Sequence, residues 1–66
     1  MDKEEIKNII NMSYSGISSK EISKLYNNNY NILLIENIIE SLINEGQVLR
    51  IQETVKGISE DIYFIK

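Results

Sequence analysis

The stretch from Asn31 to Gly46 constrains the fold of this chain more than any other. Its apolar residues recur at i, i+3, i+4, i+7 and i+8, which is the spacing of one face of an α-helix. Those residues are Ile35, Ile38, Ile39, Leu42 and Ile43. The polar residues between them are Glu36, Asn37, Glu40, Ser41 and Asn44. Because Gly46 favours a left-handed C-terminal cap, the stretch predicts a helix with an apolar inner face and an acidic outer face.

Chain length and composition limit how such a helix can be stabilised. With 66 residues, we expect a single domain over residues 1–66, near the lower limit for a self-sufficient core. There is no Cys and no His, which excludes disulfides, thiolate metal sites and the usual general base. Aliphatic packing must therefore hold the domain together.

The charge balance points away from a typical nucleic-acid binder. The formal net charge is −3, whereas such binders carry a basic footprint. No apolar run approaches the ~20 residues that span a bilayer, and the acidic N-terminus is unlike a signal peptide. We expect a soluble intracellular protein of the nucleus or cytoplasm that has no membrane partner.

Two shorter helices are predicted before the central one. Asp2 as N-cap and Glu5 three residues later form a capping-box pattern. Ser18 and Glu21 repeat that pattern, and Ile17 and Ile22 flank them as a hydrophobic staple. The apolar stripes of the two helices comprise Ile6, Ile9, Ile10 and Tyr14, and then Ile22, Leu25 and Tyr26.

A β-hairpin is predicted after the third helix, for which Asn31 or Asn29 is the expected cap. Residues 47–52 and 62–65 are rich in β-branched and apolar side chains, so they are the expected strands. Residues 53–61 are the expected loop between them. A one-residue third strand at 16–18 would fit beside this hairpin. The predicted fold is α+β, a three-helix bundle with a C-terminal β-hairpin (winged helix-turn-helix).

The motifs in this order resemble the winged-helix superfamily over nearly the whole chain. They are Gly16-Ile17-Ser18, Ile38-Ile39-x-x-Leu42-Ile43-x-x-Gly46, Val48 to Ile51, and Ile62-Tyr63-Phe64-Ile65. Within the superfamily, the Gly-Ile start, the Leu-Ile-x-x-Gly-Gln helix end and the terminal Tyr-x-Ile-Lys are similar to winged helices of the TFIIE-related RNA polymerase III subunit. A similar layout marks the C-terminal domain of the replication protein A middle subunit and the end domain of cullins and the anaphase-promoting complex. The resemblance implies a role in transcription, replication or ubiquitin ligation.

The residues favour a non-catalytic protein. Glu36 and Glu40 lie one helical turn apart, yet no His, Cys or Arg is expected to converge on them. Neither an EF-hand pattern nor a Gly-rich phosphate loop is present, so we expect no cofactor and no metal site.

Protein recognition is the preferred function because the start of the third helix carries more apolar residues than one core-facing stripe requires. The expected contact residues are Tyr30, Leu33, Leu34, Glu36, Glu40 and Tyr63. An acidic face favours a basic partner, and a homodimer would cover the same surface. Tyr63 is included because it alternates with Ile62 and Phe64, so one side of that strand is expected to face outward.

Duplex DNA binding by a transcriptional regulator is the alternative. In that case the third helix would enter the major groove, with a side-chain amide on bases and cations on phosphates. The residues for this role are Asn37 at bases, and Lys20, Lys24, Arg50 and Lys56 at phosphates. Only weak, salt-sensitive binding is expected from so few cations.

Overall fold

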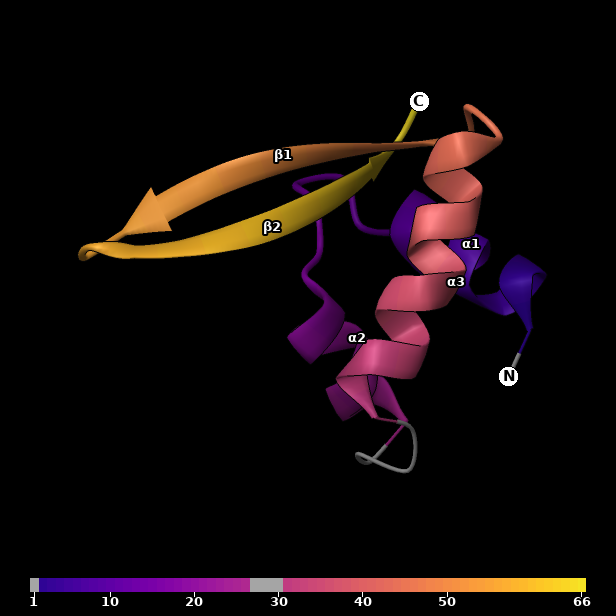
Figure 1. Ribbon diagram of the computed structural model, residues 1–66, viewed down its shortest axis with the longest axis horizontal. Helices are drawn as coiled ribbons and strands as arrows, with labels where there is room; N and C mark the ends of the chain where they lie inside the picture. The colour runs from indigo at the N-terminus through magenta and orange to yellow at the C-terminus, as the bar shows by residue number, and fades with distance from the viewer. Residues whose placement is uncertain (1, 27–30) are drawn as a thin grey trace.

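The computed structural model describes residues 2–26 and 31–66 and contains three helices followed by an antiparallel hairpin (Figure 1). The elements are α1 (Lys3–Asn11), α2 (Ser19–Leu25), α3 (Ile32–Asn44), β1 (Val48–Val55) and β2 (Ile58–Ile65). This order confirms the predicted α+β fold, a three-helix unit with a C-terminal hairpin.

Each helix begins at a side-chain cap that the sequence predicts. The caps are Asp2, Ser18 and Asn31. Each cap accepts a hydrogen bond from the backbone N–H three residues later, at 2.9, 3.2 and 2.7 Å respectively. These bonds satisfy donors that the first helical turn leaves unpaired, so the helix starts are specified locally.

The end of α3 is specified locally as well. Gly46 has a φ of +76°, as a left-handed cap requires. The N–H of Gly46 donates to the Ile43 carbonyl at 2.9 Å, and that of Gln47 donates to the Leu42 carbonyl at 3.0 Å. This pair of bonds is a Schellman motif, and it turns the chain from α3 into β1.

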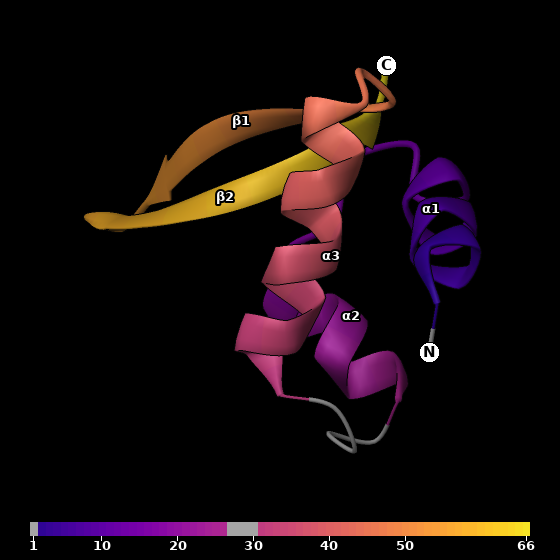
Figure 2. The same ribbon diagram turned by 45° about the vertical axis from the view of Figure 1, so that its right-hand side comes forward.

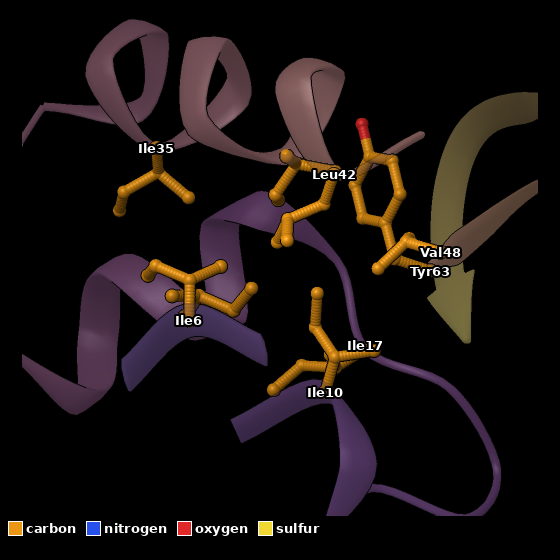
Figure 3. Close-up of a cluster of buried hydrophobic side chains, with 9 residues drawn as sticks. Ile6, Ile10, Ile17, Ile35, Leu42, Val48 and Tyr63 are labelled. Atoms are coloured by element: carbon orange, nitrogen blue, oxygen red, sulfur yellow. The ribbon is translucent and has the colours of Figure 1, made fainter. Parts of the chain in front are cut away.

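The core lies where the three helices meet the base of the hairpin, and isoleucine dominates it (Figure 3). Its buried members are Ile6, Ile10, Ile17, Ile22, Ile35, Ile39, Leu42, Val48 and Tyr63. Two residues of the predicted stripes lie outside it, because Tyr14 follows the end of α1 and Leu25 is the last residue of α2. Tyr14 is 96 % exposed and Leu25 is 63 % exposed.

The hairpin is longer than predicted, and the expected loop at residues 53–61 is wrong. Strand pairing continues without a bulge from Val48 opposite Ile65 to Val55 opposite Ile58. The connection is the two residues Lys56 and Gly57, with φ values of +53° and +79°. Positive φ at both positions is the type I′ turn that suits the twist of a two-residue hairpin.

The register divides the hairpin into two faces. Residues directly opposite each other share a face, and successive residues alternate. The inner face, whose base packs on the helices, comprises Val48, Arg50, Gln52 and Thr54 with Ile65, Tyr63, Asp61 and Ser59. The outer ribbon face comprises Leu49, Ile51, Glu53 and Val55 with Phe64, Ile62, Glu60 and Ile58. The distal half of the hairpin extends away from the helices (Figures 1 and 2).

A single β-bridge joins the base of the hairpin to the segment before α2. Ile17 and Tyr63 exchange backbone hydrogen bonds of 3.2 and 2.9 Å. The predicted one-residue third strand at 16–18 is therefore confirmed.

Candidate protein-binding surface

The outer side of α3 carries part of the predicted contact surface. The buried side of this helix is fixed by Ile35, Ile39 and Leu42. Successive residues turn by roughly 100°, which places Leu33 and Glu40 on the opposite side. Both are exposed, Leu33 at 67 %. An exposed leucine therefore lies on the same side of the helix as an acidic side chain.

Leu34 lies on a different side of the helix. It is 44 % exposed but is rotated by roughly 100° from Leu33, away from the hairpin-facing side that holds Ile32 and Glu36. Exposed apolar side chains therefore surround the start of α3 instead of forming one flat patch. Tyr30, the remaining apolar candidate here, lies outside the described residues.

A groove of about 360 Å³ runs between the start of α2, the first half of α3 and the hairpin. The residues that line it are Ser19, Lys20, Ile32, Glu36, Gln52, Ile58, Ser59, Glu60 and Asp61. Glu36 is partly buried, and its Oε2 accepts a hydrogen bond from the Ser19 hydroxyl at 3.2 Å. Three carboxylates against the single ammonium of Lys20 make this α3–hairpin groove acidic.

Carboxylates hold Arg50 on the inner face of the hairpin. Its guanidinium forms an ion pair with Glu40, and its Nε lies 3.9 Å from Oδ2 of Asp61. The guanidinium carbon lies 6.0 Å from the centre of the Tyr63 ring, at the limit of cation–π range. The hydrogen bond that Arg50 donates to Glu40 raises the pKa of Arg50 above its usual value. This cation is therefore already partnered within the domain, and the expectation that no Arg would converge on Glu40 is wrong.

Tyr63 is a core residue, and its prediction as a surface contact is wrong. The residue is only 2 % exposed, and its ring lies beside Leu42 and Val48 (Figure 3). The reason is the alternation of side chains along β2. Tyr63 and Ile65 point to the inner face of the hairpin, which packs on the helices. Burial raises the pKa of the Tyr63 hydroxyl, and the nearby Arg50 guanidinium partly opposes this increase.

The residues proposed for DNA contact have different environments. Lys20 and Lys24 are exposed on α2, and Asn37 is exposed on α3. Lys56 is exposed at the turn of the hairpin. Arg50, by contrast, is engaged by Glu40 and Asp61.

Two further properties concern only the described residues, 2–26 and 31–66. Within them, no three Asp, Glu, His or Cys side chains gather closely enough to hold a metal ion. No helix there combines the length and the apolar character that crossing a bilayer requires.

Sequence reasoning missed the hairpin side of the groove. Glu60 and Asp61 fall in the segment predicted as a loop, so they were not among the candidates. The available signal for an earlier strand start was the even spacing of Ile58, Ile62 and Phe64, which would place all three on one face of a strand. Ser19, next to the N-cap, carried no comparable signal.

Comparison with protein-family models, curated proteins and solved structures finds no match to this chain.

Proposed function

We propose that this chain is a winged-helix interaction module that docks a basic segment of a protein partner. The contact is made by the outer side of α3 and the α3–hairpin groove. Catalysis plays no part in this role. The setting proposed for it is a transcription, replication or related nucleic-acid machinery of the nucleus or cytoplasm.

The observation that carries the proposal is the pairing of apolar and acidic groups around α3. Leu33 exposes two thirds of its side chain, and Ile32 and Ile58 contribute apolar wall to the groove. Glu36 and Asp61 supply negative charge beside that apolar surface. Exposed apolar surface with a polar rim is typical of interaction sites, and complementary charge steers and orients a partner.

Duplex DNA is the competing ligand. A reader of the major groove would bring Glu36 close to the phosphates, where like charge opposes binding, and Glu40 would add to this repulsion once Arg50 had left it. Arg50 would first have to leave Glu40, with which it is paired. The charges of α3 therefore favour protein over DNA.

A backbone-amide NMR titration separates the two ligands. One probe is a synthetic peptide of alternating lysine and leucine, and the other is a mixed-sequence DNA duplex, both at low salt. We expect the peptide to shift the amide signals of Leu33, Glu36 and Asp61, and added salt to weaken its binding. The double substitution Glu36→Gln and Asp61→Asn should reduce the peptide affinity several-fold.

Leu25→Ala is the matched control, because Leu25 is exposed on α2 and does not line the groove. It should leave the peptide affinity unchanged. Micromolar DNA binding centred on α3 and Lys56, lost on added salt, would replace the proposal with the DNA alternative. An unchanged peptide affinity in the double variant that lacks both carboxylates would also contradict the proposal.

A further inference from the structure

The outer ribbon face carries the exposed apolar side chains of the hairpin, and the proposed function uses none of them except Ile58, which also lines the groove. Ile51 and Val55 on β1 are 52 % and 55 % exposed, and Ile58 opposite Val55 is 71 % exposed. Only the base of this face is covered, since Ile62 is buried beside Gly16. A two-stranded ribbon is marginally stable unless further strands or a helix pack on it, and here only the base of the hairpin packs on the helices.

The outer edge of β1 carries backbone groups that point away from β2. Tyr63 directs its N–H and C=O toward Ile17, so its opposite residue Arg50 directs its own groups away from β2. By alternation, Gln52 and Thr54 do the same. Within residues 2–26 and 31–66, no strand pairs with this edge.

This edge lacks several of the features that discourage strand pairing, although β1 carries the charged residues Arg50 and Glu53. The chain has no proline, and pairing in the hairpin runs without a bulge. The cation of β1, Arg50, is held on the inner face by Glu40. Edges without such protection pair readily with another strand.

We propose that this edge pairs with its equivalent in a second copy of the chain, giving a continuous four-stranded sheet. The two β1 strands run antiparallel about a two-fold axis at Ile51. This position sets Ile51 against Ile51 of the second copy as a non-hydrogen-bonded pair. Arg50 and Gln52 then supply the flanking hydrogen-bonded pairs, as their outward groups require.

Side-chain chemistry fits this register. The outer ribbon face gains a row of four isoleucines, formed by Ile62 and Ile51 of each copy. On the inner face, Arg50 lies opposite Gln52 of the second copy, and Asp61 of that copy lies next in the row. A two-fold axis at Glu53 would instead set two carboxylates against each other, which is unfavourable.

Salt distinguishes this association from the proposed function. Each copy carries a net charge of −3, so the copies repel at long range and screening should strengthen the dimer. Binding of a basic partner at the groove should weaken under the same change. Failure of one proposal therefore leaves the other intact.

Sedimentation of the whole chain is the first test. Between about 10 μM and about 1 mM protein, a range suited to weak association, the mass should rise from 7.7 kDa toward twice that value. The rise should be larger in about 0.5 M NaCl than at low salt. A monomer throughout the range at high salt would overturn the proposal.

Proline substitutions test the edge itself. Gln52→Pro removes an outward N–H of β1 and spares the bonds between β1 and β2, so the dimer should be lost. Ser59→Pro is the matched control, because its N–H points outward from the opposite edge on β2. It should dimerise like the unchanged protein. Equal effects of the two substitutions would contradict the proposal.

Single cysteines test the register without relying on those variants, since the chain has no native Cys. In Ile51→Cys the two Cα atoms would lie about 4.5 Å apart, within the range that a disulfide bridges. In Val55→Cys, on the same face, they would lie roughly 25 Å apart at about 3.3 Å per residue. We expect Ile51→Cys to cross-link at least about tenfold faster. Equal rates would overturn the register and the two-fold pairing.

Discussion

Glu40 on α3 and Arg50 on β1 form an ion pair that ties the outer side of the helix to the inner face of the hairpin. The pair also neutralises one of the acidic groups on α3. Asp61 and the Tyr63 ring approach the same guanidinium from β2. Arg50 therefore links helix and hairpin at the surface, in addition to the core contacts of Val48 and Tyr63 with α3.

Glu40→Gln should lower the free energy of unfolding by only about 0.2–1 kcal/mol, because the pair is solvent-exposed. Urea denaturation followed by circular dichroism measures this change. A double-mutant cycle with Arg50→Gln isolates the pairwise term. A coupling indistinguishable from zero would show that the pair does not connect helix and hairpin.

Gly16→Ala should destabilise the domain far more than Gly46→Ala. Both glycines have positive φ, but a methyl group at Gly16 would overlap Ile62 and come within 2.6 Å of Phe64. At Gly46 nothing lies within 4 Å. We expect a loss of about 2–4 kcal/mol at Gly16 and about 1 kcal/mol at Gly46. Similar denaturation midpoints for the two variants would contradict this packing.

Ile39→Val should lower the free energy of unfolding more than Leu33→Ala does, because Ile39 lies in the core and Leu33 on the surface of α3. Ile39 is fully buried, so removing one methylene should cost about 0.5–1.5 kcal/mol. Leu33 is exposed, and its truncation should change the unfolding free energy by less than about 0.5 kcal/mol. Thermal denaturation measures both. A large loss of unfolding free energy in Leu33→Ala would mean that this side chain stabilises the fold and is not free to contact a partner.

Lys56→Asn should stabilise the hairpin by a few tenths to about 1 kcal/mol. Lys56 holds a φ of +53°, a conformation that asparagine adopts more readily than lysine does. Thr54→Asn is a useful comparison, because Thr54 lies in the strand and should not benefit. The measurement is the thermal midpoint of each variant. Equal midpoints for Lys56→Asn and the unchanged protein would contradict the type I′ turn.

Stability should decline above pH 10 because of Tyr63. Its pKa is raised in the folded state from an ordinary value of 10.0, so the unfolded chain loses this proton at lower pH than the native state does. The native state then binds more protons, and the free energy of unfolding falls as pH rises through the folded pKa. Tyr63→Phe should remove this component. Urea denaturation from about pH 8 to about pH 11.5 tests it, since the range spans the tyrosine pKa. Identical slopes for both proteins would contradict it.

Features that depend on nearby residues were predictable from the sequence. The caps at Asp2, Ser18 and Asn31 and the Gly46 terminator each involve bonds within five residues, so local chemistry specifies them. The apolar face of α3 was predictable for the same reason. The spacing of apolar residues along a single helix is enough to show which side of that helix is buried.

Features that depend on strand register were not predictable. The turn at Lys56 and Gly57 lacks the Asn-Gly or Asp-Gly signal, so the polar residues beside it resembled a loop. Alternation shows that Tyr63 and Phe64 face opposite sides, but it does not show which side the helices cover. The bridge between Ile17 and Tyr63 settles that question, and it joins residues far apart in the sequence.

The bridge between Ile17 and Tyr63 also means that the core can be completed only late in synthesis. The helices and Ile17 emerge long before Tyr63, whose ring closes the core against Leu42 and Val48. A nascent chain that stops short of Tyr63 therefore leaves those apolar side chains uncovered. Nearly all the described domain must leave the ribosome before its core is complete, and until then the exposed aliphatic surface is available to chaperones.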